Sequence, residues 1–236
     1  MLLTRVITLV LACQTRWYNS ILPTKRCCII EPQPPSGYNY WDDPRIHILG
    51  NNGFGGIVHA TFAPFVTKLI DNISYDGRDI RGEAIKQYVK SNKRILDVCC
   101  GTGRSTAEGA IGLDTSKEMI RMANWIKPPN DSGKFVLGNA ENWGNAYEFD
   151  VVTCMFGLHE MPRSARIKVI QNCIRITNER VIIIDIHPSY IPSESMLVCE
   201  PYLLDYLENI EEEMKMWKKT SIIDGRVTRW DFYKTL

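Results

Sequence analysis

One segment of this 236-residue chain limits the possible folds more than any other, because in it an apolar strand runs directly into a glycine-rich turn. Residues 95–106 read Ile-Leu-Asp-Val-Cys-Cys-Gly-Thr-Gly-Arg-Ser-Thr. Glycines at such a turn let the backbone approach a ligand, with the start of a helix behind them. A dinucleotide site would carry a third glycine where Thr106 stands and an acid about 20 residues further on. The next strand-end acid, Asp114, comes earlier, so the turn predicts a ligand loop of another kind.

Strands and helices alternate after residue 93, as the spacing of apolar residues indicates. We expect strands at 94–99, 110–114, 134–137, 149–155 and 180–186, and helices at 116–125 and 163–177. Only ten residues separate Gly103 from Asp114, which leaves room for one or two helical turns. The alternation predicts an α/β fold, a doubly wound Rossmann-like sheet of mostly parallel strands.

The C-terminal part departs from this alternation. Apolar residues recur every three or four positions over 203–217, which predicts an amphipathic helix whose acids precede its lysines. Asp224-Gly225 lies between residues 221–223 and 227–233, which predicts an antiparallel hairpin that closes the edge of the sheet. The aromatic residues near this helix either pack in the core or cover a site, and they are Tyr202, Tyr206 and Trp217.

The first thirty residues differ in charge from the rest. They hold Arg5, Arg16, Lys25 and Arg26 and no acid, whereas the remaining residues carry 24 bases and 27 acids. Their apolar run, residues 6–12, is much shorter than the roughly 20 residues of a spanning helix, so we expect no stable membrane span. A basic, acid-free segment is typical of an organelle address, for a mitochondrion or a plastid. A secretory signal and an ordinary cytoplasmic N-terminus are the alternatives.

Shifts in composition divide the chain further. We expect a targeting leader at 1–30, a proline-rich linker at 31–37, a helical cap at 38–92 with helices near 57–73 and 78–90, and a ligand-binding domain at 93–236. The part after residue 30 has a net charge of −3, which argues against a nucleic-acid partner.

The eight cysteines follow no metal or disulfide pattern. Neither C-x-x-C nor H-x-x-x-H occurs, so we expect no metal site. The cysteines after residue 93 are an adjacent pair and three in apolar segments, Cys99, Cys100, Cys154, Cys173 and Cys199. Buried, reduced thiols are the expectation, and they favour a reducing compartment.

The acid just before the turn discriminates between ligands. Asp97 stands at the end of the strand, where its carboxylate would repel a pyrophosphate but attract an ammonium and a sulfonium group. S-adenosylmethionine carries both of these cations. With residues 111–119, 138–141 and 149–152, the turn resembles successive motifs of class I S-adenosylmethionine-dependent methyltransferases, closest to the methyltransferase type 11 (UbiE-like) group. The resemblance covers about residues 93–188.

Carried over by position, the resemblance implies a cofactor site made of Asp97, Cys99, Gly101, Gly103, Asp114, Thr115, Met119, Asn139, Ala140, Glu141, Met155 and Phe156. In it Asp97 and the turn backbone would hold the methionine portion, and Asp114 would accept hydrogen bonds from the ribose. Met119 and residues 139–141 would meet the adenine, and residues 155–156 would lie near the transferred methyl group. This chain has Cys99 where the family commonly has glycine, and Asn139 where it commonly has an acid.

Two further residues are candidates for the chemistry with the acceptor. His159 and Glu160 follow the strand at 149–155, so they would reach the same edge of the sheet. Either they take a proton from the acceptor or position it, or Glu160 starts the next helix and His159 packs in a loop. Displacement at a sulfonium depends chiefly on alignment, so a base is not required.

The resemblance implies an enzyme that moves a methyl group from S-adenosylmethionine to a small-molecule acceptor, aromatic or lipid-like, by direct displacement. In the cap, the glycines at 53–56 with Trp41, His47 and His59 either line an acceptor pocket or accompany a turn before a helix. A protein or nucleic-acid methyltransferase and a non-catalytic, cofactor-binding partner subunit are the alternatives. Residues 154–157 lack the Asn/Asp-Pro-Pro-aromatic sequence of amino-directed nucleic-acid enzymes.

Overall fold

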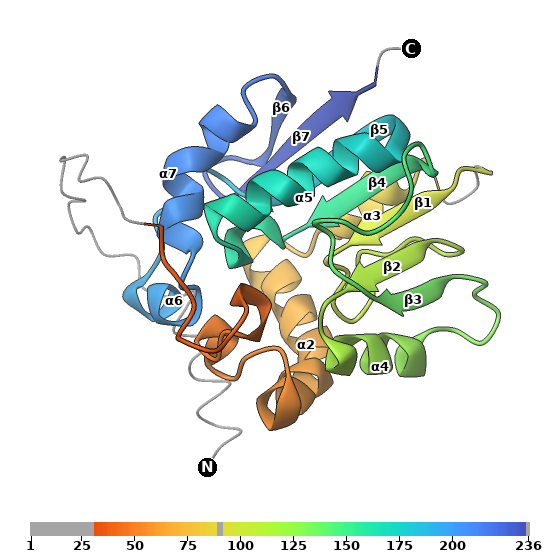
Figure 1. Ribbon diagram of the computed structural model, residues 1–236. Helices are drawn as coiled ribbons and strands as arrows, with labels where there is room; N and C mark the ends of the chain where they lie inside the picture. Colours follow the sequence, from red (N-terminus) through yellow and green to blue (C-terminus); the bar gives the residue numbers. More distant parts are fainter. Residues whose placement is uncertain (1–30, 89–91, 235–236) are drawn as a thin grey trace.

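A seven-stranded sheet forms the centre of the protein (Figure 1). The structure, a computed structural model, describes residues 31–88 and 92–234, so the expected leader lies outside the described residues. The strand order is β3-β2-β1-β4-β5-β7-β6. Strands β1 to β5 run parallel to one another, and β7 pairs antiparallel with both β5 and β6. This confirms the expected doubly wound, mostly parallel sheet with its C-terminal hairpin.

Helices and strands follow each other in the expected order after residue 94. The strands are β1 (Ile95–Val98), β2 (Ile111–Asp114), β3 (Lys134–Leu137), β4 (Phe149–Met155), β5 (Thr177–Ile186), β6 (Lys218–Ile223) and β7 (Val227–Tyr233). The helices are α2 (Gly53–Ser74), α3 (Ile80–Ile85), α4 (Lys117–Ile126), α5 (Arg163–Ile176), α6 (Glu194–Cys199) and α7 (Leu203–Glu213). Three short 3₁₀ turns are η1 (Tyr40–Asp42), η2 (Ile46–Ile48) and η3 (Leu158–Glu160).

Apolar side chains cover both faces of the sheet, because successive side chains of β4 and β5 point to opposite faces and apolar ones pack on each face. On one face Val181 and Ile183 pack in a cluster with α5 and α7. This cluster includes the buried Tyr206 and Trp217, and Tyr202 is buried as well, so the aromatic stripe belongs to the core. On the other face β5 packs against α3 and the residue after α2, Tyr75.

Three expectations about the helices are wrong. Residues 99–105 form turns, and no helix stands between β1 and β2, because Asp97 holds this segment through Ser105 and Thr106. Helix α7 ends at Glu213, so residues 214–217 of the expected helix form a turn that leads directly into β6. Helix α3 has only six residues. Helix α6 was not expected.

The order of the strands reverses direction between β1 and β4. The chain winds outward from β1 through β2 to β3 and then returns to β4 on the other side of β1. Ligands of open α/β sheets bind at the carboxyl ends of the strands beside such a switch point. The turn after β1 and the segment after β4 therefore meet at the expected ligand site.

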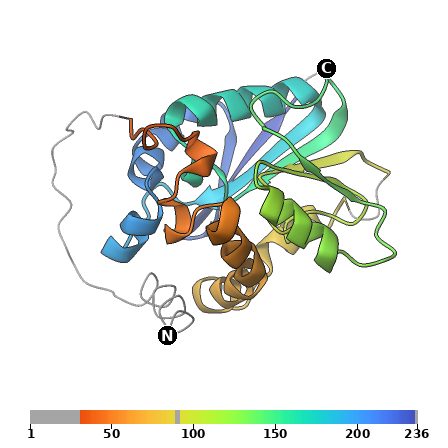
Figure 2. The ribbon, with the colours of Figure 1, turned by 60° about the horizontal axis from the view of Figure 1, so that its bottom comes forward.

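Helix α2, with 22 residues the longest described helix, lies beside α4 at this edge of the sheet (Figures 1 and 2). A Cβ atom on Gly56 would come within 2.5 Å of Asn51 O and 3.5 Å of Glu118 Cγ, so glycine permits this close packing. By length and composition α2 could also cross a membrane, a property shared by core helices of soluble proteins. The absence of a span therefore stays a prediction.

Candidate active site

Asp97 lies at the end of β1, fully buried. Its Oδ2 accepts hydrogen bonds from Ser105 Oγ at 2.8 Å and Thr106 Oγ1 at 2.7 Å, and its Oδ1 accepts one from Thr153 Oγ1 at 2.8 Å. Burial raises the pKa of Asp97, while these hydroxyl groups oppose the rise. Asp97 does not line the cavity described below, so its structural contribution is to shape the turn that does.

Asp114, at the end of β2, joins two segments of the site. Its Oδ2 accepts the backbone N–H of Gly101 and its Oδ1 that of Ser116, both at 2.8 Å. Burial raises the pKa of Asp114 to about 6. A carboxylate offers about four lone-pair sites, so each oxygen retains one for a ligand. Asp114 lines the cavity, and neither it nor Asp97 forms an ion pair with a described residue.

The turn after β1 is open at Gly101 and tightly packed at Gly103. Gly101 has a φ of 53°, and a Cβ atom there would meet nothing within 4 Å, so the backbone is free for a ligand to approach. Gly103 has a φ of 85°, and a Cβ atom there would lie 2.5 Å from the ring of Phe135. Both positions therefore need glycine, but Gly103 needs it for packing and does not line the cavity.

Cys99 takes up the left-handed conformation that glycine usually occupies, with a φ of 56°. Phe156, after β4, has a φ of 59°. Strain of this kind costs about 1–3 kcal/mol and gathers at functional sites. The two strained residues follow the two strands of the switch point, and both line the cavity. Cys99, Cys100, Cys154 and Cys173 are free thiols, as expected.

The residues assigned to adenine lie around the start of α4 and the segment after β3. Ser116 caps α4 by accepting the N–H of Met119. Met119, Asn139 and Ala140 line the cavity, whereas Glu141 does not. Instead, Glu141 pairs with Lys168 at 3.2 Å.

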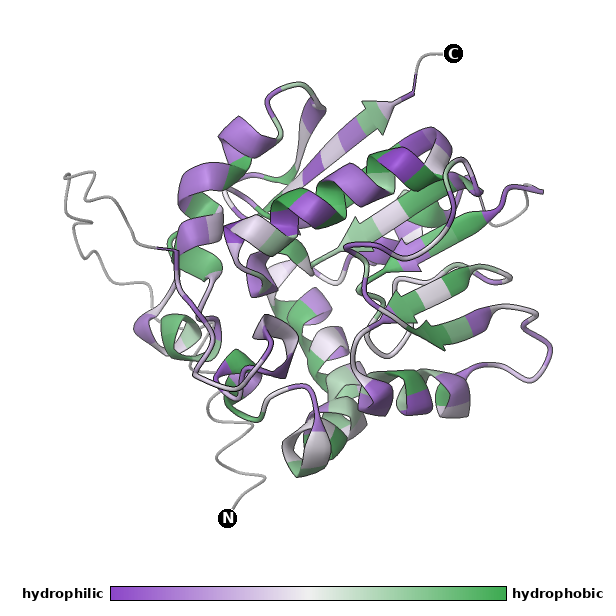
Figure 3. Ribbon diagram, in the orientation of Figure 1, coloured by the Kyte–Doolittle hydropathy of each residue, from purple (hydrophilic) through white to green (hydrophobic). Residues whose placement is uncertain are grey.

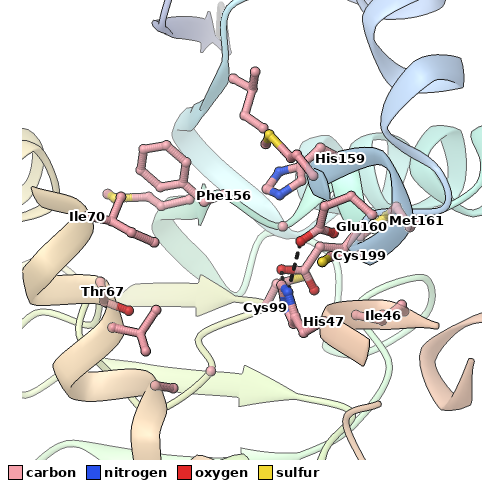
Figure 4. A pocket seen from close by; sticks show the side chains of 18 of the residues that line it. Ile46, His47, Thr67, Ile70, Cys99, Phe156, His159, Glu160, Met161 and Cys199 are labelled. Atoms are coloured by element: carbon pink, nitrogen blue, oxygen red, sulfur yellow. Dashed lines mark hydrogen bonds and ion pairs between the residues drawn. The ribbon is translucent and has the colours of Figure 1, made fainter. Parts of the chain in front are cut away.

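A single cavity of about 2330 Å³ opens at the carboxyl ends of the strands. Single-ligand pockets span about 300–1,000 Å³, so this one has room for two ligands side by side. Of the residues expected at the site it brings together Cys99, Gly101, Asp114, Thr115, Met119, Asn139, Ala140, Met155, Phe156, His159 and Glu160. The cap contributes Trp41, His47 and His59, whereas the glycines at 53–56 begin helix α2 and do not line the cavity. Figure 4 shows Thr67 and Ile70 of α2 on the side opposite His159 and Glu160.

His159 is oriented by a buried carboxylate. Its Nδ1 donates to Asp185 Oδ1 at 2.6 Å, while Asp185 Oδ2 accepts the backbone N–H groups of Leu158 at 2.9 Å and His159 at 3.3 Å. Burial lowers the pKa of His159, but the charge of Asp185 outweighs it and raises the pKa to about 9. The other ring nitrogen, Nε2, forms no hydrogen bond with a described residue, and His159 lines the cavity. A proton can therefore be exchanged at Nε2.

His47 lies between two carboxylates from distant segments (Figure 4). Its Nε2 is 3.1 Å from Glu160 Oε1 and its Nδ1 is 2.8 Å from Glu200 Oε1. An imidazole donates from both nitrogens only when it is protonated. Burial lowers the pKa of His47, yet the two glutamates raise it well above its usual value, and His47 in turn lowers the pKa of Glu160 to about 2 although burial raises it. Glu160 is therefore held as an ion and is unsuited to take a proton.

The sequence interpretation missed Asp185 and Glu200. Asp185 interrupts a run of isoleucines near the end of β5, and a lone acid in an apolar strand is the signal that could have found it. Glu200 has no such signal, because it stands in a polar connection between α6 and α7. One of its oxygens, Oε2, is buried without a hydrogen-bond partner among the described residues.

The comparisons with known proteins point to one family. Residues 95–180 match the model of a methyltransferase domain. The demethylmenaquinone methyltransferases of Oceanobacillus iheyensis and Staphylococcus carnosus are 36% identical over 89 residues and 33% identical over 120 residues. These matches cover 33% and 44% of this chain, and they span only 37% and 50% of the two relatives. The magnesium protoporphyrin IX methyltransferase of Synechocystis PCC 6803, solved with bound S-adenosylmethionine, has a TM-score of 0.46 and 14% identity, over 65% of this chain and 79% of that one.

The strand order defines a Rossmann-like domain with a cavity at the carboxyl ends of β1 and β2, beside the switch point. Residues 95–180 of this fold match a methyltransferase domain, which agrees with the expected resemblance to class I S-adenosylmethionine-dependent methyltransferases. The residues present fit that cofactor, because the Gly101 backbone is open to a ligand and each oxygen of Asp114 keeps a lone pair for the ribose hydroxyls.

Proposed function

We propose that this protein transfers a methyl group from S-adenosylmethionine to a small-molecule acceptor of aromatic or lipid-like character. The observation that carries the proposal is that one cavity joins Asp114 and the turn after β1 to the buried His159–Asp185 pair. Asp114 and the turn after β1, which Asp97 shapes, would hold the cofactor. The histidine side would receive the acceptor.

Bound S-adenosylmethionine supplies an electrophilic methyl group. Asp114 would accept hydrogen bonds from the ribose hydroxyls, and the backbone of Gly101 would face the methionine portion. Met119 would lie against the adenine. These residues would fix the methyl group in front of Met155 and Phe156, and alignment of this kind supplies roughly 7–11 kcal/mol.

The wall opposite the histidines favours an apolar acceptor. Phe62, Val66 and Ile70 of α2 line the cavity at helical spacing. A polar end of the acceptor would face His159 and an apolar body would follow α2. The two relatives named as demethylmenaquinone methyltransferases support an acceptor of aromatic or lipid-like character.

His159 is the candidate proton acceptor. As the acceptor gains the methyl group, it would release a proton to Nε2, while Asp185 holds the ring through Nδ1. Asp185 is thus a positioning residue, since it acts through His159. Glu160 would stay ionised and would hold His47 in place.

The test combines binding and turnover. Calorimetric titration with S-adenosylmethionine and its demethylated product should show binding. Incubation with methyl-labelled cofactor and a metabolite extract should then place label in small molecules. Label only in macromolecules would contradict the small-molecule acceptor, and binding without turnover would indicate a non-catalytic subunit. A protein that does not bind the cofactor would refute the proposal altogether.

A further inference from the structure

Helix α2 presents large apolar side chains to solvent on the side away from the cavity. Phe54 is 80% exposed, Ile57 51% and Phe65 75%. Their spacing along the helix puts them on one face, whereas Phe62 and Val66 point toward the cavity. In Figure 3 α2 is mostly green and pale, whereas α7 shows the purple outer surface of an ordinary amphipathic helix. A solvent-facing helix with an apolar outer side indicates a docking surface.

The exposed charges of α2 and its neighbour α4 are all positive. The only acid of α2, Asp71, and the only acid of α4, Glu118, are both buried. Their exposed charged residues are Lys68 on α2, and Lys117 and Arg121 on α4. The surface therefore combines apolar side chains with basic ones, as do helices that lie in a membrane interface and attract anionic lipids.

An exposed tryptophan stands beside this surface. Trp125 is 79% exposed and follows Glu118 by seven residues, so both lie on the same side of α4. Glu118 lies against α2 at Gly56. Figures 1 and 2 show the two helices next to each other. Tryptophan is enriched where an apolar layer meets water, so its position agrees with a membrane interface.

The inner side of α2 is fixed to the domain. Asp71 pairs with Arg81 and with Arg104, each at 2.8 Å. Removing a partner from a buried ion pair is costly, so α2 would not leave the domain to cross a bilayer. The helix would lie on the surface of the membrane.

The cavity has an apolar rim. Four large side chains both line it and are substantially exposed, namely Ile48, Ile73, Ile191 and Leu204. Ile73 belongs to α2 itself, so the rim and the helix are continuous. An acceptor dissolved in a bilayer could reach such a rim without crossing water.

We propose that the outer face of α2, with the basic side of α4, docks on an anionic lipid surface. The idea that the acceptor enters from this membrane rests on the proposed function, but the docking does not. A second copy of the chain is a poorer occupant, because Lys68 and the α4 bases of the two copies would face each other and repel.

Co-sedimentation of the full chain with vesicles tests the docking. We expect binding to vesicles of phosphatidylcholine mixed with phosphatidylglycerol, and weaker binding to phosphatidylcholine alone. The Phe54→Ser and Phe65→Ser variants should each lower the partition coefficient about tenfold, since each removes a phenylalanine from the apolar layer. The Lys117→Glu/Arg121→Glu variant should lose mainly the preference for anionic lipid.

Met216→Ser is the matched control, because Met216 is 85% exposed and lies after α7, away from α2. This variant should bind vesicles like the unchanged protein. Equal vesicle binding by the Phe54→Ser/Phe65→Ser double variant and the unchanged chain would overturn the proposal. It would also be overturned if the unchanged chain were a dimer in solution and the double variant a monomer. Cofactor titration on the same samples reports folding and tests the methyltransferase proposal separately.

Discussion

The two sides of the cavity are built in different ways. On the cofactor side, Asp97 and Asp114 are carboxylates held by hydroxyl and backbone N–H groups of neighbouring segments. On the acceptor side, carboxylates are paired with imidazoles, and the partners come from distant parts of the chain. His47 and Glu160, for instance, are 113 positions apart.

This difference has a chemical consequence. On the cofactor side Asp114 lines the cavity and keeps a free lone pair on each oxygen, so this side is suited to a ligand that donates hydrogen bonds. The acceptor side already balances most of its charges through His47 and His159. It is therefore suited to a neutral acceptor that exchanges one proton. Substitutions on the two sides should accordingly alter different measurements.

Asp114→Ala should give the largest effect. It would remove the two charge-assisted hydrogen bonds that we propose Asp114 accepts from the ribose, each worth about 1.5–3 kcal/mol, so the Kd for S-adenosylmethionine should rise about 10²–10⁴-fold. Calorimetric titration measures it. Glu108→Ala is the control, because Glu108 is an exposed acid between the same two strands. An unchanged Kd in folded Asp114→Ala would remove the distinction between the two sides.

His159→Gln should act only on the acceptor side. We expect the rate of methyl transfer to fall about 10²–10⁴-fold, as for loss of a general base, while the Kd of the cofactor stays the same. The rate is measured as the transfer of label from the methyl-labelled cofactor to the metabolite extract in which the unchanged protein shows turnover. In the unchanged protein, this rate should rise with pH up to about 9, where the His159 proton is lost. A rate that falls above that pH would show that the protonated ring is the active form.

The His159–Asp185 pair should also be visible in the pH dependence of stability. The pKa of His159 is raised from 6.5 to about 9 on folding, so its contribution is complete below pH 6.5 and disappears as the pH rises through 9. Urea unfolding should show a loss of about 3 kcal/mol across this window. The loss should be smaller in His159→Gln, whose amide can still donate to Asp185. Equal pH profiles for the two proteins would contradict the pairing.

The contrast also explains how much the sequence could predict. The cofactor side follows from local spacing, because its residues lie at or shortly after the ends of their own strands, as Asp114 does at the end of β2. The strands and the sheet followed in the same way. The acceptor side depends on tertiary packing, which brings Glu200 from the α6–α7 connection to His47 in the cap. Even on the cofactor side, the inward direction of Asp97 became apparent only when Ser105 and Thr153 were seen to surround it.

The smallest effect should appear where the two sides touch. Gly157 follows β4, and a Cβ atom there would lie 2.7 Å from Cys99 Cβ, after β1. Gly157→Ala should cost about 1–3 kcal/mol through this overlap. Cys99→Gly removes the same Cβ atom and relieves about 1–2 kcal/mol of strain, because glycine takes up the left-handed backbone conformation of Cys99 without cost. This gain offsets the lost packing of the side chain, so the variant alone should change stability little.

The double variant Cys99→Gly/Gly157→Ala should therefore recover most of the stability that Gly157→Ala loses, giving a coupling of about 1–2 kcal/mol in urea unfolding. Cys199→Ala, a buried cysteine on α6, should instead add its cost independently to that of Gly157→Ala. If the stability effects of Cys99→Gly and Gly157→Ala were additive as well, the two residues would not be in contact at the ends of β1 and β4. The cofactor and acceptor sides would then not share this part of the cavity wall, beside which we propose that the methyl group is transferred.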